Sequence, residues 1–368
     1  MHDGKIHYFY TGNVKHFDRD DYDYVLTGRD QNQIHMVTEN PDKLGEKHIA
    51  VGPVDYPDDI STHVRDPKIL EHDGIYYMVL GARTKDDRGC VLVYTSHDLE
   101  CWKYATRIEL GEKFGFMWEC PDLFELDGEL ILVCCPQGVP ADGWRYQNPH
   151  QCVWFRIEAD WEAPSFKIAG QGMPPMVDAG LDFYAPQSFA DADGRRIMIG
   201  WAGCPDATAQ NPTVERGWQC ALTVPRVLNM RDGKLCQWPA REVEQLRKER
   251  VSVTAGETVG SPGRLFDAVV SCRGTKSIEL EVREGVVVCF ANGMLTLDMG
   301  DEGYGRDKRS VELDELYCLR VLSDATMLEV FVNDGEVALT SRTYSSAAPA
   351  MQLRAEGDAS MEFYRLAR

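Results

Sequence analysis

The chain has 368 residues, enough for two domains that each bury a core. Aromatic residues make up 10% of it, and with 32 glycines and 18 prolines the composition is typical of a turn-rich globular protein. The formal net charge of −20 argues against nucleic acids and anionic membrane surfaces as partners. No apolar run reaches the roughly 18 residues of a membrane span.

The twelve cysteines form no Cys-x-x-Cys pair and no Cys/His cluster with zinc spacing. This pattern predicts small buried thiols in a reducing compartment, with neither a metal nor another cofactor. We therefore expect a cytoplasmic protein, and the sequence opens with no signal peptide.

In the first two thirds of the chain, five Asp-Gly pairs are each followed at once by a short apolar run. Asp-Gly suits the type I′ hairpin turn, which needs positive φ at both central residues. Hairpins spaced tens of residues apart, with no helical period between them, predict a β-propeller, although a β-sandwich with several hairpins is the alternative. Residues 94–102 read as a strand, a polar turn and then Trp102, a side chain suited to packing between sheets. The pairs are Asp3-Gly4, Asp73-Gly74, Asp127-Gly128, Asp193-Gly194 and, more weakly, Asp232-Gly233.

The pattern of charged and apolar residues changes near residue 240. Residues 241–251 are charged, with Val243 and Leu246 three apart, and predict a short linking helix. Residues 278–282 alternate with period two, and residues 327–340 read as a hairpin. We expect a propeller domain over residues 1–240, the linker helix over 241–251 and a β-sandwich over 252–368.

Residues 117–122 place the carboxylate of Glu119 beside the indole of Trp118. An apolar wall raises a carboxyl pKa, and an acid that keeps its proton near neutrality can protonate a leaving oxygen. A structural glutamate at a strand end is the plain alternative.

Two further stretches carry polar side chains that suit a sugar site. In the first, Arg65 is a permanent cation that keeps Asp66 ionised, and Pro67 biases Asp66 toward an extended backbone. A capped turn with a surface ion pair explains the same residues. In the second, residues 178–187, carboxylates and Tyr184 suit a polyol site or a plain loop. Trp201 is a candidate stacking platform or part of a sheet core.

In this order the motifs resemble glycoside hydrolase family 32, in its sucrose-6-phosphate hydrolase and invertase branch. The resemblance spans nearly the whole chain. It includes Arg-Asp-Pro at 65–67, Trp-Glu-Cys-Pro-Asp at 118–122 and Asp-Phe-Tyr-Ala-Pro-Gln at 182–187. It extends to residues 3–14, 135–138, 222–226 and 329–335.

The resemblance implies retaining hydrolysis of a β-D-fructofuranoside. Glu119 would be the general acid and then the general base, and Asp66 would hold fructose hydroxyls and stabilise the transition state. Arg65 would orient the site, and Trp118, Asp182, Tyr184 and Trp201 would contact the sugar. The implied fold is a five-bladed β-propeller followed by a β-sandwich.

The chain departs from the family at its nucleophile, an Asp in a Trp-Met-Asn-Asp-Pro-Asn-Gly type motif. The only Asn-Asp pair here is Asn333-Asp334, in the predicted sandwich hairpin. We therefore expect an incomplete propeller that lacks its first blade, weak or absent turnover, and aggregation, an oligomer or a second chain that fills the gap. The alternatives are a non-catalytic carbohydrate-binding protein and a structural remnant without a ligand. An arabinan-acting propeller enzyme fits the motifs less well.

Overall fold

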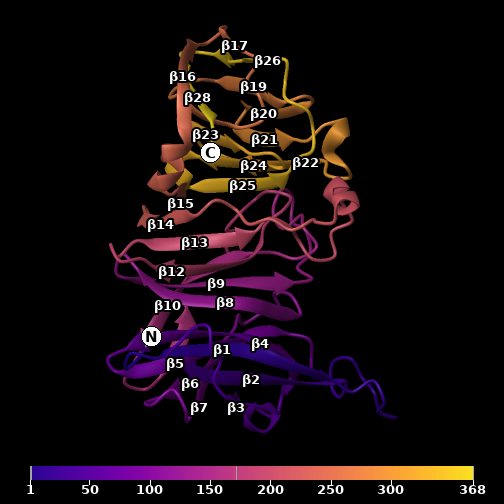
Figure 1. The fold of residues 1–368 in the computed structure, drawn as a ribbon, viewed down its shortest axis with the longest axis vertical. Coiled ribbons are helices and arrows are strands. Elements are labelled where there is room, and N and C mark those ends of the chain that lie inside the picture. Colours follow the sequence, from indigo (N-terminus) through magenta and orange to yellow (C-terminus); the bar gives the residue numbers. More distant parts are fainter. Residues whose placement is uncertain (1, 171, 368) are drawn as a thin grey trace. The chain divides into compact units, whose positions relative to one another are not determined.

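The computed structural model describes residues 2–170 and 172–367 and is built mainly from β-strands (Figure 1). Its contacts divide the chain into two compact units. Unit 1 comprises Met1–Pro140 and Gln151–Pro175, and unit 2 comprises Ala141–His150 and Met176–Arg368.

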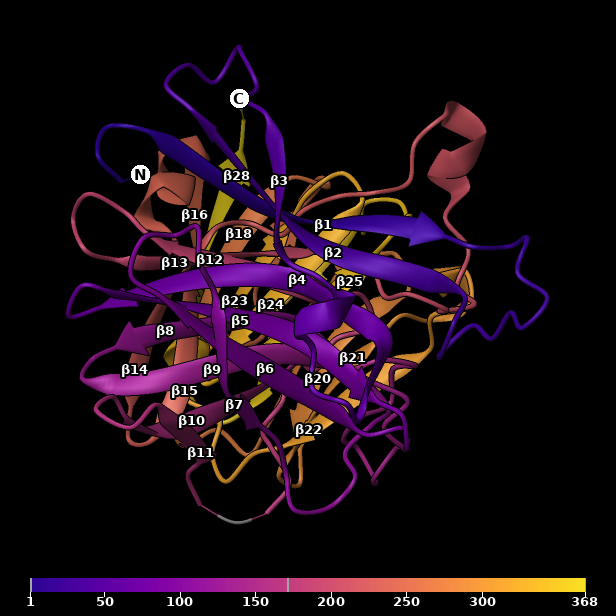
Figure 2. The same ribbon diagram turned by 90° about the horizontal axis from the view of Figure 1, so that it is seen from below.

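Unit 1 consists of three antiparallel sheets that follow one another along the chain. The strands of the second sheet lie side by side in Figure 2, in the order of the sequence. The first sheet has three strands, β1 (Ile6–Lys15), β2 (Arg29–Thr38) and β3 (Lys47–Val51), and the 3₁₀ helix η1 (Pro53–Asp55) follows it. The second has β4 (Ile60–His72), β5 (Ile75–Thr84), β6 (Gly89–Ser96) and β7 (Lys103–Ile108). The third has β8 (Met117–Leu126), β9 (Glu129–Gln137), β10 (Val153–Asp160) and β11 (Ser165–Ile168).

The Asp-Gly pairs form turns where the sequence predicts them. Both residues of four pairs have positive φ, for example 49° at Asp73 and 75° at Gly74, as a type I′ turn requires. The fifth pair differs, because only Gly194 has positive φ, and the Asp191 N–H donates to the Arg195 carbonyl across a longer loop.

Trp102 packs between sheets as predicted. Its ring meets that of Phe9 edge to face at 5.8 Å between centroids, and both contact a buried cluster formed by the first two sheets. Val51 and Leu80 are among its members. Apolar burial therefore joins successive sheets in unit 1.

Unit 2 begins with a fourth antiparallel sheet of the same kind. It joins β12 (Tyr184–Ala190), β13 (Arg196–Trp201), β14 (Arg226–Arg231) and β15 (Lys234–Pro239), with the 3₁₀ helix η2 (Pro212–Arg216) in one connection.

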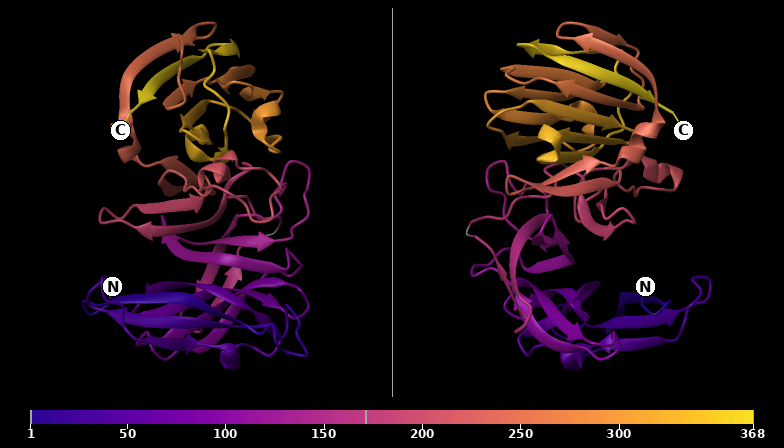
Figure 3. Two further views of the ribbon diagram at one scale, coloured as in Figure 1. Left: turned by 45° about the vertical axis from the view of Figure 1, so that its right-hand side comes forward. Right: turned by 90° about the vertical axis from the view of Figure 1, so that its left-hand side faces the viewer.

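The remaining strands of unit 2 form a β-sandwich, coloured orange to yellow in Figure 3. Side chains such as Val270 and Leu319 from one sheet share a core with Leu280 and Val288 from the other, which agrees with the predicted sandwich. The six-stranded sheet has the order β16 (Arg247–Thr254), β28 (Ser360–Leu366), β18 (Phe266–Ser271), β23 (Cys318–Ser323), β24 (Met327–Val332) and β25 (Val337–Arg342). The five-stranded sheet has the order β22 (Lys308–Glu312), β21 (Met294–Asp298), β20 (Val286–Ala291), β19 (Ser277–Arg283) and β27 (Arg354–Glu356). β17 (Thr258–Gly260) pairs with β26 (Ala350–Gln352), and the 3₁₀ helices η4 (Asp301–Gly303) and η5 (Asn333–Gly335) lie in turns.

The linking helix is shorter than the predicted 241–251. A 3₁₀ helix, η3, covers Arg241–Leu246, and β16 begins directly at Arg247. The ladder from β16 to β28 satisfies the backbone of these residues, and the Arg247 Nε donates to Asp267 Oδ2 at 2.7 Å. Tertiary pairing therefore overrides the weak helical period of this stretch.

Candidate active site

The two motifs with the strongest predicted chemistry lie on the first strands of neighbouring sheets in unit 1. Arg65 and Asp66 belong to β4, and Glu119 belongs to β8. Each strand is at the edge of its sheet, where a proline without an N–H is tolerated.

One backbone feature recurs in β4, β8 and β12. In each strand a residue with positive φ comes just before a proline, and the strand register shifts at that point. The φ values are 64° at Asp66, 48° at Cys120 and 49° at Ala185. The expectation of an extended backbone at Asp66 is therefore wrong. The proline cannot extend the ladder, so the strand bulges, and Asp tolerates the left-handed region better than most residues do. Each bulge re-aims the side chain before it.

The bulges bring Arg65, Asp66 and Glu119 together. Arg65 donates from Nε and Nη2 to Glu119 Oε1, at 2.8 and 2.6 Å. The backbone N–H of Cys120 donates to Asp66 Oδ2 at 2.9 Å, and the Cys120 thiol lies 3.6 Å from the same oxygen. The Arg65 and Glu119 side chains keep 16% and 15% of their surface exposed, so the ion pair stays open to solvent.

Burial raises the pKa of Asp66 above its ordinary value, although the Cys120 N–H and the Arg65 guanidinium act in the opposite direction. Glu119, a second carboxylate close by, adds to the rise. Two neighbouring carboxyl groups in different surroundings can divide acid and electrostatic roles between them.

Trp118 lies elsewhere than predicted. Its ring is fully buried, its Nε1 donates to the Phe114 carbonyl at 2.7 Å, and it stacks on Phe155 at 5.3 Å. A Cβ added at Gly89 would come within 2.1 Å of the indole, so the core is shaped around it. Successive strand residues point to opposite faces, and Trp118 therefore neither walls Glu119 nor reaches a sugar.

Gln137 supplies a contact that sequence reasoning missed. Its Nε2 donates to Glu119 Oε2 at 2.7 Å from β9, next to β8 in the same sheet. The sequence signals were its place just after the apolar run 130–135 and within residues 135–138 of the resemblance; in the structure it lies directly opposite Met117 in the register. Glu119 is thus held by a guanidinium on one oxygen and by an amide on the other.

Asp182, Tyr184 and Trp201 belong to unit 2. Asp182 and Trp201 line a cavity of about 300 Å³, but Arg306 donates to both carboxylate oxygens of Asp182, at 2.6 and 2.9 Å. Tyr184 is buried, with its ring 6.2 Å from that of His150. Their predicted contact with sugar stays a prediction.

The structure also bears on metal binding and on membrane insertion. Within residues 2–170 and 172–367, no group of three or more His, Cys, Asp or Glu side chains is arranged to hold a metal ion. None of the twelve cysteines forms a disulfide bond. No helix in the described part of the chain combines the length and apolarity of a membrane span. The polar groups that the structure brings together at the site in unit 1 are two carboxyl groups, a guanidinium and an amide.

Comparison with known proteins assigns the family. The model of the glycosyl hydrolases family 32 N-terminal domain matches residues 1–239, and that of the family 32 C-terminal domain matches residues 242–366. Sucrose-6-phosphate hydrolase from Salmonella typhimurium is 35% identical over 362 residues, covering 94% of this chain and 72% of the relative. The enzyme of the same name from Bacillus subtilis is 31% identical over 365 residues, covering 93% and 72%.

Solved structures agree. Sucrose-6-phosphate hydrolase from Lactobacillus gasseri superposes with a TM-score of 0.86 at 25% identity, over 100% of this chain and 77% of that one. A β-fructofuranosidase from Bombyx mori gives 0.84 at 27% identity, over 100% and 78%. A mutant of the latter enzyme was solved in complex with sucrose. The chain therefore belongs to glycoside hydrolase family 32, and it is a glycoside hydrolase of the sucrose-6-phosphate hydrolase and β-fructofuranosidase class.

Proposed function

We propose that the site in unit 1 acts in retaining hydrolysis of β-D-fructofuranosides: sucrose, sucrose 6-phosphate or fructo-oligosaccharides. The observation that carries the proposal is the joint placement of Arg65, Asp66 and Glu119, with Arg65 bonded to the Glu119 carboxylate. The substrate class is supported by the similarity to sucrose-6-phosphate hydrolases and to a β-fructofuranosidase solved with sucrose.

Glu119 protonates the glycosidic oxygen and later removes a proton from the attacking water. Arg65 orients the Glu119 carboxylate, and the Gln137 amide can donate to that group when it is ionised and accept from it when it is protonated. Asp66 accepts hydrogen bonds from fructose hydroxyls and stabilises positive charge that develops at the anomeric carbon. Asp182, Tyr184 and Trp201 line the sugar pocket in this proposal.

A retaining enzyme also needs a carboxylate nucleophile about 5 to 5.5 Å from the acid. The 368 residues hold no Asn-Asp-Pro sequence that would supply it. We expect this chain by itself to release little or no glucose from sucrose, and Glu119→Gln to abolish any release that remains.

The test is glucose release from sucrose, sucrose 6-phosphate and a fructo-oligosaccharide, with the first-formed fructose anomer followed by NMR. Turnover near that of an ordinary invertase would contradict the impairment. Turnover that survives Glu119→Gln would contradict the role of Glu119. Calorimetric binding of sucrose without any hydrolysis favours the second candidate, a carbohydrate-binding protein that keeps the contacts of Arg65 and Asp66.

We further propose that residues 1–240 supply blades of a five-bladed propeller, followed by the sandwich from residue 252. Four successive sheets, the first with three strands and the others with four, support this proposal. Unpaired strand edges favour association, so we expect this chain by itself to form an oligomer or to pair with a second chain. A monomer in analytical ultracentrifugation across the micromolar range would count against it. The cytoplasmic location also stays a prediction and rests on the free thiols.

A further inference from the structure

His63 makes two contacts that the proposed function does not use. It lies in β4 two residues before Arg65, and only 2% of its surface is exposed. Its Nε2 lies 3.0 Å from the carbonyl oxygen of Tyr24, and its Nδ1 lies 3.1 Å from Nη1 of Arg65. The imidazole thus stands between the β1–β2 connection and the guanidinium that holds Glu119.

Chemistry fixes which nitrogen carries the proton. A carbonyl oxygen only accepts, so Nε2 donates to Tyr24. A guanidinium only donates, so Nδ1 accepts from Arg65 and must be unprotonated. Both nitrogens of a charged imidazolium carry protons, so neither can accept a hydrogen bond from Arg65. His63 is therefore neutral, with its proton on Nε2.

The surroundings keep His63 neutral. Burial, with smaller contributions from the charges of Arg65, Arg29 and Arg83, lowers the pKa of His63 to about 4, although the hydrogen bond to the Tyr24 carbonyl acts in the opposite direction. No carboxylate is among the groups that perturb it most. At neutral pH the acceptor that Arg65 needs is therefore present.

The segment on the other side of His63 is tightly tied. Asp23 Oδ1 accepts from the N–H groups of Val25 and Leu26, both at 2.8 Å. The Thr62 N–H, next to His63, donates to the Val25 carbonyl at 3.0 Å. Residues 23–28 thus form an ordered support that presents the Tyr24 carbonyl to His63.

We propose that His63 is a positioning residue that transmits the position of residues 23–28 to Arg65 and so fixes the guanidinium that orients Glu119. Arg65 donates from Nε and Nη2 to Glu119. The acceptors of its Nη1 are His63 and, at 3.4 Å, Gln31. Without the acceptor at Nδ1, Nη1 keeps only the longer contact to Gln31, and the guanidinium is held less firmly in the plane that serves Glu119. The proposal rests on the function proposed above for Arg65 and Glu119.

The first experiment reads the imidazole directly. A chain with ¹⁵N-labelled histidine gives two-bond proton–nitrogen correlations, and the signal of His63 is the one missing from His63→Asn. We expect the Nε2–H tautomer, unchanged on acidification to about pH 5. An Nδ1–H tautomer, or titration near the ordinary value, overturns the proposal whether or not the chain turns over sugar.

The second experiment separates the two contacts. An Asn side chain at position 63 reaches the place of Nδ1 and keeps the bond to Arg65, whereas a Gln side chain reaches the place of Nε2 and keeps the bond to Tyr24. We expect His63→Gln to weaken sucrose binding about tenfold with unchanged amide exchange in residues 23–28. We expect His63→Asn to speed that exchange and to leave the affinity within about twofold.

The exposed His97 of the same unit provides the control, because His97→Gln should alter neither readout. A histidine that only fills the core would make both variants lose both properties together, and that result rejects the proposal. If the unaltered chain binds no sucrose, the proposed function fails. In that case the NMR signal of the Arg65 Nε–H tests the role of His63. If His63 positions Arg65, the signal persists in His63→Asn and is lost by exchange with solvent in His63→Gln. Any other pattern refutes this role.

Discussion

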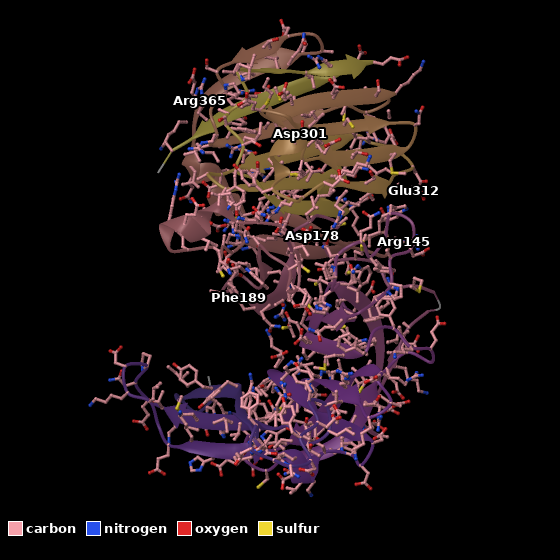
Figure 4. All side chains as sticks on the ribbon, turned by 90° about the vertical axis from the view of Figure 1, so that its right-hand side faces the viewer. Arg145, Asp178, Phe189, Asp301, Glu312 and Arg365 are labelled. Atoms are coloured by element: carbon pink, nitrogen blue, oxygen red, sulfur yellow. The ribbon has the colours of Figure 1, made fainter. Side chains whose placement is uncertain are left out.

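Two arginines of this protein bind carboxylates in opposite ways. In unit 2, Arg226 uses all its N–H groups: on Glu329 at 3.2 and 2.7 Å, Asp178 at 3.0 Å, Gln237 at 2.6 Å and Thr340 at 2.5 Å. None of its surface is exposed, and Asp178, labelled in Figure 4, is as deeply buried at its side chain. In unit 1, the Arg65 side chain keeps 16% exposure and bonds a single carboxylate oxygen of Glu119.

We interpret this difference in burial and bonding as the difference between a charge that stabilises the fold and a charge that we propose takes part in the reaction. The rings of Phe183 and Phe331, each 5.0 Å from the Arg226 guanidinium, exclude water from that cluster. Since every donor has a fixed acceptor, no substrate can replace one without leaving a buried charge unpaired. Arg226 thereby fastens the fourth sheet to β24 and β25 of the sandwich. The Arg65–Glu119 pair stays open to solvent, as the proton transfer that we propose for Glu119 requires.

Arg226→Met tests the structural half of this comparison and should have the largest effect. It leaves Asp178 and Glu329 buried without their cation, so we expect the free energy of unfolding to fall by about 3–5 kcal/mol. Urea denaturation followed by tryptophan fluorescence measures the fall. The control is Arg231→Met, because Arg231 is only partly buried and its loss should cost less than about 1 kcal/mol. Equal losses for the two variants would mean that the buried cluster contributes no more than a surface pair.

The sequence predicted those parts of the fold that local chemistry decides. Positive φ at Asp73 and Gly74 follows from the residue types, and strand alternation follows from burial on one face. Arg226 and Glu329 are 103 positions apart in the chain, so no local sequence pattern predicts their contact. Only the resemblance connected residues 222–226 with 329–335.

The site was predicted in part for the same reason. Motif order identified Arg65, Asp66 and Glu119, but local reasoning placed Trp118 against Glu119 because it ignored the alternation of side chains in β8. It also gave Asp66 an extended backbone, because a bulge depends on pairing with β5. Gln137 was missed as a contact because Glu119 lies on another strand, and His63 was missed because Tyr24 lies in the distant connection between β1 and β2.

Asp66→Asn extends the comparison, because we expect this substitution to increase the free energy of unfolding by a smaller amount. Burial raises the folded-state pKa of Asp66 above its unfolded value, so just above the unfolded value the native state binds the proton that the unfolded state has released. The stability from this carboxyl is therefore present at low pH and is lost as pH rises through the folded pKa. Replacing the ionised group by a neutral amide should raise the free energy of unfolding near neutral pH by about 1 kcal/mol.

Urea denaturation at about pH 7 and again at about pH 4.5 checks both the sign and the pH dependence. The gap between Asp66→Asn and the unaltered chain should narrow in acid, because the unaltered chain then gains its proton. Asp178→Asn is the matched substitution in unit 2 and should destabilise, because Arg226 would lose one of its two anionic partners. If Asp66→Asn is destabilising at neutral pH, the Asp66 carboxylate belongs with the structural charges of unit 2, and its assignment to the reaction loses its physical support.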